Sequence, residues 1–262
     1  MDKKFPTLKI LASLIAAVLF LTGCQPKSTE TPLPDGPEIT ATEQVTLPKP
    51  GEPFAISQDI TIDPAVTEDI DSLLVSRYLY EGLVRLDDNG DVQPGLASSW
   101  IISDDQLDYI FTIRPNAQFS DGTPITTDII VDNFNRWFDP QSPLHGDGNY
   151  PSWKAIFLGF NGERDAENKA VSQVDGVQKV DQNLVIVHLN RPVPELLQYL
   201  ASPAFSILSV DALSSGNYDM RDNSVITSGP YLIASWTDSG LTLAPSKSYW
   251  NPAEGNIEFI WK

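Results

Sequence analysis

The sequence contains few of the residues from which catalytic and metal sites are usually built. Its 262 residues include one cysteine and two histidines. These are too few for the common zinc sites of Cys and His ligands, and one cysteine cannot form a disulfide within the chain. The motifs G-x-S-x-G, H-E-x-x-H, the P-loop and G-x-G-x-x-G before a helix are also missing. We therefore expect a protein that is not an enzyme and that uses no metal or cofactor.

Two weaker signals for a metal have simpler structural interpretations. The run from Asp87 to Asp91 has some likeness to a calcium loop, but the first ligand position would be Arg85. A β-hairpin turn explains the same residues better. We place His188 within a strand and His145 on the surface of a loop, and we expect no metal ligand at either.

Basic residues are scarce. The chain has 17 Lys and Arg against 35 Asp and Glu, a net charge of −18. Nucleic acid is therefore excluded as a partner, because binding to phosphates needs a surplus of Lys and Arg. The acidity is explained by solubility or by attraction of a cationic ligand. With 41% hydrophobic residues, the chain has enough apolar material for a core, in one large or two ordinary domains.

The sequence has no hydrophobic run long enough to cross a membrane. Its most apolar stretch, residues 10–21, follows several lysines and is shorter than the ~20 residues that a spanning helix needs. It is typical of a signal-peptide core. The stretch ends in Leu21-Thr22-Gly23-Cys24, which resembles a bacterial lipobox, so we predict a signal peptide over residues 1–24 and lipid on Cys24. An ordinary signal peptide followed by a chance cysteine is the alternative.

Residues 25–53 are rich in proline and have no apolar period. This composition predicts a solvated, extended tether between the lipid anchor and the folded part. The fold is expected to begin at residue 54 with a short strand.

The first half of the folded part shows two clear strand signals. Asn89-Gly90 between apolar flanks predicts a hairpin with a type I′ turn, which needs positive φ at both central residues. In residues 107–114 the odd positions are all apolar, which predicts a strand with one buried face.

Two helices are predicted around these strands. The first begins at Thr67, buries Ile70, Leu73, Leu74 and Tyr78, and ends at Gly82 as a C′ glycine. The second begins near Thr126 or Thr127 and has apolar residues spaced for one buried face: Ile130, Phe134, Trp137, Phe138.

The second half begins with a Gly-rich exposed loop over residues 144–153. A hairpin over residues 174–190 follows, and its second strand is apolar enough to be covered on both faces. We then expect a short helix over 194–200, a strand pair over 229–236 and 241–244, and a final strand over 257–262.

Seven short motifs occur in register from residue 62 onward. They are Ile62-Asp63-Pro64, Tyr80-Glu81-Gly82-Leu83, Asp88-Asn89-Gly90, Pro94-Gly95-Leu96-Ala97-Ser98-Ser99-Trp100, Phe119-Ser120-Asp121-Gly122-Thr123-Pro124, Ser228-Gly229-Pro230-Tyr231 and Tyr249-Trp250-Asn251. In this order and spacing the chain resembles the bacterial extracellular solute-binding proteins of family 5, over about four fifths of its length.

The resemblance implies a mixed α/β fold of the type II periplasmic-binding-protein kind. Members of the family are about twice as long, because two lobes close on the ligand. Residues 54–262 would be the N-terminal lobe, with about 75–190 forming an inserted subdomain. The second lobe is expected to be missing, which makes the chain look C-terminally truncated and leaves the two-lobe clamp incomplete.

The resemblance also implies a function and a site. The chain would be the substrate-binding lipoprotein of an ABC importer, exported and lipid-anchored outside the membrane or in the periplasm, which delivers a peptide or similar small solute to a permease. Trp153 and Tyr150 best match the segment that sends an aromatic side chain into the ligand cleft, and Asp59 is a third candidate contact. Trp153 could equally cap the helix that carries Trp137 and Phe138. The visible residues do not choose between peptide, nickel chelate and sugar.

Two other function classes stay open from the sequence. A truncated lobe that survives as a surface-interaction lipoprotein would share the same motifs, and the reading frame beyond Lys262 would distinguish it. An exported hydrolase would need a catalytic constellation, and none is found.

A 262-residue product should expose apolar surface meant for the missing segments, and we expect it to aggregate. The check is size-exclusion chromatography with a thermal melt. A well-behaved monomer with one cooperative transition would contradict this expectation.

Overall fold

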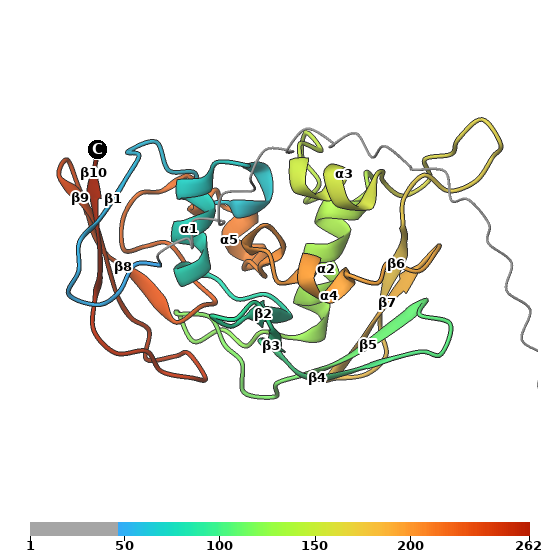
Figure 1. Cartoon of the computed structure of the whole chain (residues 1–262), viewed down its shortest axis with the longest axis horizontal. Helices are drawn as coiled ribbons and strands as arrows, with labels where there is room; N and C mark the ends of the chain where they lie inside the picture. The colour runs from blue at the N-terminus through green and yellow to red at the C-terminus, as the bar shows by residue number, and fades with distance from the viewer. Residues whose placement is uncertain (1–46) are drawn as a thin grey trace, which may run out of the picture. The chain divides into compact units, whose positions relative to one another are not determined.

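Two four-stranded sheets enclose the helices of the chain (Figure 1). The structure is a computed structural model that describes residues 47–262, which form one compact unit. The predicted signal peptide, Cys24 and the tether up to residue 46 lie outside the described residues. In the part that is described, no helix is long and apolar enough to cross a membrane.

The first sheet has the strand order β1-β10-β9-β8. These strands are β1 (Phe54–Ile56), β8 (Tyr231–Thr237), β9 (Gly240–Pro245) and β10 (Ile257–Trp261). β1 is parallel to β10, with Phe54 opposite Phe259, and the other pairs are antiparallel. All four strands were predicted. The pairing of β1 with β10 brings the first and last strands of the described chain together.

The second sheet is fully antiparallel, in the order β4-β5-β7-β6. It consists of β4 (Ala97–Ile102), β5 (Asp108–Ile113), β6 (Val174–Lys179) and β7 (Leu184–Leu189). Tyr109, Phe111 and Ile113 on β5 are buried, which confirms the predicted apolar face. β7 was predicted to be covered on both faces, but buried and partly exposed residues alternate along it, so only one face is fully buried.

The helices lie between the two sheets (Figure 1). α1 packs on β8 of the first sheet, and α2 packs on β6 and β7 of the second. The elements are α1 (Ile70–Leu79), α2 (Thr127–Phe138), α3 (Pro151–Phe157), α4 (Leu196–Leu200), α5 (Val210–Ser214) and the 3-10 helices η1 (Pro64–Val66), η2 (Pro203–Phe205) and η3 (Asn217–Asp219).

α2 follows its prediction closely. Thr126 is the N-cap, and its hydroxyl accepts a hydrogen bond from the backbone N–H of Ile129. Four large side chains of the predicted stripe are buried: Ile130, Phe134, Trp137, Phe138. Arg136 is buried on the same helix, which the apolar pattern did not indicate.

α1 differs from its prediction at both ends. Its N-cap is Asp69, whose carboxylate accepts from the N–H of Ser72, and the buried side chains include Val75 and Leu79. Ile70 is 78% exposed, because this later start turns it away from the core. The helix ends at Leu79 with Tyr80 as its C-cap, so Gly82 is not its cap.

Gly82 is instead needed for close packing. A Cβ at Gly82 would lie 3.1 Å from the carbonyl oxygen of Val84 and 3.2 Å from that of Leu200. A side chain there would push apart two backbones that are in contact.

Each sheet has its own hydrophobic core. One cluster joins the inner face of the first sheet to α1, with Ile56, Val75 and Leu243 among its members. The other joins the second sheet to α2 and α3, with Phe111 and Trp137 at its centre. The second sheet lies inside the limits predicted for an inserted subdomain, and the subdomain itself stays a prediction.

The predicted hairpin is present, but its turn type was wrong. β2 (Val84–Leu86) pairs with β3 (Val92–Pro94) in antiparallel register. The N–H of Gly90 donates to the carbonyl of Asp87 at 3.0 Å, and of the pair Asn89-Gly90 only Gly90 has positive φ, at 84°. This geometry is a turn followed by a left-handed glycine rather than a type I′ turn. The Asp87 carboxylate supports it by accepting from the N–H groups of Asn89 and Asp91.

The two turn types predict different effects of substitution. Gly90→Ala should lower the free energy of unfolding by about 1–2 kcal/mol, because a Cβ is strained in the left-handed region. Asn89→Ala should change it by less than about 0.5 kcal/mol. Urea denaturation measures the free energy of unfolding of both variants. Equal decreases in this free energy at the two positions would favour the type I′ turn.

Candidate functional site

An open hollow of about 700 Å³ lies beside the loop that precedes α3. We call it the loop hollow. Its walls come from residues 143–150, from the segment around η1, from α2 and from the region of α5 and η3. The side chains on which the argument depends are Asp63, Arg136, His145, Tyr150 and Tyr218.

An ion pair is buried at the wall of the loop hollow. The two terminal guanidinium nitrogens of Arg136 on α2 donate to the carboxylate of Asp63, one at 3.3 Å and the other in a closer contact. The same carboxylate caps η1 by accepting from the N–H of Ala65. The bidentate geometry and this additional bond offset the cost of removing both charges from water.

Two tyrosines and a histidine complete this wall. The hydroxyl of Tyr150 donates to the carbonyl of His145 at 2.8 Å, and Nδ1 of His145 lies 2.8 Å from the carbonyl oxygen of Arg136. The hydroxyl of Tyr218 accepts from the N–H of Ser209 at 2.9 Å. Burial raises the pKa of both tyrosines, and Asp63 raises each further. The hydroxyls are therefore neutral donors and acceptors.

His145 was predicted on the surface, and this prediction was wrong. It is 7% exposed, and its ring lies edge-on to the rings of Tyr150 and Phe160. The Gly-rich composition of the loop gave no sign that the loop folds back over its own histidine.

Of the predicted ligand contacts, only Tyr150 borders the loop hollow. Trp153 was predicted in a loop, but it lies in α3, is 1% exposed and packs against Trp137 and Phe138. Its indole N–H donates to the carbonyl of Gly159 at 3.0 Å. This position agrees with the alternative that Trp153 caps the helix that carries Trp137 and Phe138. Asp59 is exposed and lines neither the loop hollow nor the pocket described below.

Sequence reasoning missed Arg136 and Tyr218. A signal for Arg136 existed, since a charged residue stands beside the apolar stripe of α2 and a buried charge needs a partner. Nothing in the local sequence joins it to Asp63, 73 residues away. Asp63 itself stood in one of the seven motifs.

The loop hollow is suited to binding. Its side chains comprise fixed charges and neutral hydroxyls, without a nucleophile held by a base. Across residues 47–262 there is no group of three or more His, Cys, Asp and Glu that could hold a metal ion.

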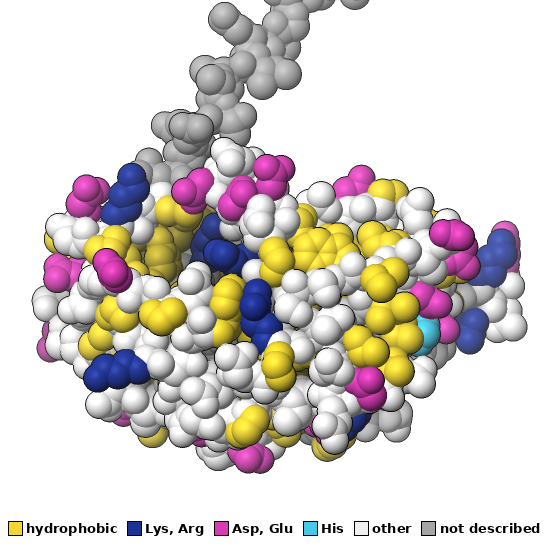
Figure 2. All heavy atoms as spheres, turned by 90° about the horizontal axis from the view of Figure 1, so that it is seen from below, with side chains coloured by type: hydrophobic (Ala, Val, Ile, Leu, Met, Phe, Trp, Pro, Cys, Tyr) yellow, Lys and Arg dark blue, Asp and Glu magenta, His cyan; other side chains and the backbone are white. Residues whose placement is uncertain are grey.

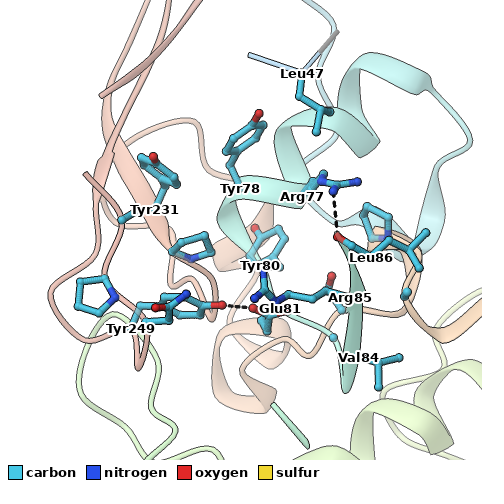
Figure 3. Close-up of a pocket in the computed structure, with 18 residues that line it drawn as sticks. Leu47, Arg77, Tyr78, Tyr80, Glu81, Val84, Arg85, Leu86, Tyr231 and Tyr249 are labelled. Atoms are coloured by element: carbon cyan, nitrogen blue, oxygen red, sulfur yellow. Dashed lines mark hydrogen bonds between the residues drawn. The ribbon is translucent and has the colours of Figure 1, made fainter. Parts of the chain in front are cut away.

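A second, more enclosed cavity of about 280 Å³ lies near the end of α1. We call it the tyrosine pocket. It is drawn in Figure 3, and it shares no lining residue with the loop hollow. Four tyrosines and two arginines line it together with Glu81: Arg77, Tyr78, Tyr80, Arg85, Tyr231, Tyr249.

Glu81 is the buried charge of the tyrosine pocket. It is 5% exposed, and the hydroxyl of Tyr249 donates to its carboxylate in a close contact (Figure 3). The pKa of Glu81 is raised to about 7, because the effect of burial outweighs the hydrogen bond from Tyr249 and the guanidinium groups of Arg85, Arg114 and Arg77, all of which lower it. Glu81 therefore titrates near neutral pH.

The architecture is that of one lobe of a type II periplasmic binding protein. The structure of the periplasmic murein tripeptide-binding protein MppA in its unliganded open form superposes with a TM-score of 0.66 and 26% identity, over 81% of this chain and 42% of that one. HbpA2 from Haemophilus parasuis gives a TM-score of 0.66 and 26% identity, over 80% and 42%.

The sequence comparisons define the family. Residues 91–260 match the bacterial extracellular solute-binding proteins, family 5 (Middle), and the chain belongs to this family. It is 28% identical to MppA and 29% identical to the oligopeptide-binding protein OppA of Escherichia coli, each over 204 residues. These alignments cover 76% of this chain and 36% of each relative. The family consists of solute-binding proteins, which confirms that the chain is not an enzyme.

The position of Trp153 predicts a loss of stability on truncation. Trp153→Ala should lower the free energy of unfolding by about 3–5 kcal/mol, because it leaves a cavity among aromatic rings. The half-exposed Trp236→Ala on β8 is the matched control and should cost clearly less. Denaturant unfolding measures both. A Trp153→Ala variant of normal stability that loses ligand binding would instead place Trp153 in the ligand cleft.

Glu81 predicts a pH-dependent term in stability. Because its folded pKa of about 7 is above the ordinary 4.5, the folded state retains the proton more strongly, so stability is full below about pH 4.5 and falls as pH rises through 7. The loss is about 3 kcal/mol at about 1.4 kcal/mol per pKa unit. Glu81→Gln should remove this slope. Urea melts of both proteins from pH 4.5 to 8 make the comparison, and parallel pH profiles would contradict it.

Proposed function

We propose that the chain is the ligand-capturing part of an ABC importer and that the loop hollow is its contribution to the binding site. The observation that carries this proposal is the loop hollow itself, walled by a buried Asp63–Arg136 pair, in a chain of a solute-binding family. A bound ligand would favour a closed arrangement of the whole protein, which a membrane permease would recognise.

The charges of the loop hollow favour a ligand that carries a positive group. Its lining holds Asp63, Asp147 and Asp219 against one guanidinium, that of Arg136. Asp147 and Asp219 are exposed and free to approach a ligand. The ammonium terminus of a peptide fits this balance, and the peptide chain would find hydrogen-bond partners in Asn149 and Ser214. The relatives MppA and OppA are peptide-binding by name, which supports the same choice.

The predicted contact residues take different parts in this proposal. Tyr150 would form part of the wall beneath the ligand. Trp153 would act by holding α3 and the loop in place, since its ring lies in the core. Asp59 stays a prediction, for a ligand large enough to extend beyond the loop hollow.

The chain would work at a membrane surface. We propose that residues 1–24 direct export, that Cys24 carries a lipid, and that the predicted tether of residues 25–53 joins the lipid to the lobe. The last part of this range already packs on the lobe, because Pro48 is buried and its carbonyl accepts a hydrogen bond from the hydroxyl of Tyr78 at 2.8 Å. The lipobox-like Leu21-Thr22-Gly23-Cys24 and the proline-rich composition support this part of the proposal.

Titration with a small peptide tests the proposed site. Ala-Ala-Ala should shift amide NMR signals around residues 143–150, and N-acetylated Ala-Ala-Ala should bind about tenfold more weakly because it lacks the ammonium group. Asp147→Asn should weaken binding of the free peptide, and Asp238→Asn, an exposed aspartate on the β8–β9 turn, is the matched control. Equal affinity for both peptides, or shifts confined to other faces, would contradict the proposal.

A further inference from the structure

The tyrosine pocket has the construction of a binding site, and the proposed function does not use it. Its walls come from α1, the segment after it, β2, β8 and the loop before β10, all fixed by the two cores. Cavities of about this size, lined by aromatic rings and a few converging polar groups, are typical places for a small ligand.

Two arginines give the mouth of the tyrosine pocket its charge. One N–H of Arg77 donates to the carbonyl of Leu86 at 3.2 Å, and one N–H of Arg85 donates to the carbonyl of Pro94 at 3.3 Å. These bonds hold both guanidinium groups while their other N–H groups stay available. Between residues 47 and 262 neither arginine forms an ion pair. Both side chains are exposed, and on the face seen in Figure 2 basic side chains gather in a hollow between hydrophobic ones.

The carboxylates near the pocket do not cancel this charge. Glu81 is buried, engaged by the hydroxyl of Tyr249, and faces three guanidinium groups: Arg85, Arg114, Arg77. Asp88 is exposed and lies near Tyr78. Because the chain as a whole carries −18, a pocket with surplus guanidinium stands out from its surroundings.

The interior of the pocket suits a flat apolar ring. Tyr78 and Tyr231 meet edge-on with ring centroids 5.7 Å apart, and both line the pocket (Figure 3). The ring of Tyr80 forms another wall, and its hydroxyl is buried without a hydrogen-bond partner in the described chain. Aromatic faces and edges of this kind bind a single ring by offset or edge-on contact.

We propose that the tyrosine pocket binds a small aromatic carboxylate, with the ring among the tyrosines and the carboxylate held by Arg77 and Arg85. This site is separate from the loop hollow: it would hold a negative group of its ligand, whereas the loop hollow would hold a positive one.

Isothermal titration calorimetry tests this site with three ligands of similar shape that differ in charge. Phenylacetate should bind, and its neutral analogue phenylacetamide should bind at least about tenfold more weakly, because it cannot form charge-assisted bonds with the guanidinium groups. The cation phenethylamine should bind more weakly still. Equal binding of phenylacetate and phenylacetamide, or tighter binding of phenethylamine, would overturn the proposal.

Variants locate the binding. Arg85→Gln and Arg77→Gln should each weaken phenylacetate binding about tenfold. Both side chains are exposed, so the variants should keep the circular dichroism and melting temperature of the parent. Arg221→Gln, an exposed arginine that does not line the pocket, is the matched control and should leave the affinity unchanged. Equal losses in all three variants would show that general charge and not this pocket binds the anion.

Discussion

The structure depends on a short non-helical segment, residues 80–83, that runs between the two hydrophobic cores. Tyr80 belongs to the core of the first sheet and Leu83 to that of the second. A buried backbone must find partners for its N–H and C=O groups, and here distant segments supply them. The carbonyls of residues 81, 82 and 83 accept from the N–H groups of residues 207, 96 and 97, and Ser228 accepts from the N–H of residue 81. Close packing completes the arrangement, since a Cβ at Gly229 would lie 2.7 Å from the backbone of Leu79.

This segment also places the two cavities. Glu81 projects into the tyrosine pocket, and Tyr80 lines the pocket while its ring meets that of Tyr218 edge-on at 5.9 Å. Tyr218 belongs to the loop hollow. A wall residue of one cavity is therefore in contact with a wall residue of the other. Residues 80–83 keep this position because a hydrophobic core packs against them on each side. Their local sequence shows no helix or strand period that would have predicted it.

The local sequence predicted most elements because their signals are local. The alternation in β5, the cap and stripe of α2, and the strands of the first sheet each follow from side chains within one element. The predictions failed where a neighbour decided the outcome. Which side of α1 is buried depends on its starting residue, which is set by the Asp69 cap. Asn89 does not have the positive φ of a type I′ turn, and its N–H donates to the carboxylate of Asp87. Trp153 packs against the rings of Trp137 and Phe157 in the core, and these contacts cannot be predicted from the composition of its own segment.

The sequence by itself determined the class of the protein. Its seven motifs in register, its scarcity of Cys and His, and its strong negative charge led to the solute-binding family and away from enzymes and nucleic acid. Only the tertiary structure decided which side chains share a cavity. Asp63 and Arg136, or Glu81 and Tyr249, lie 73 and 168 residues apart. Such pairs are joined by packing between elements, and no local periodicity records which distant partner a buried charge will meet.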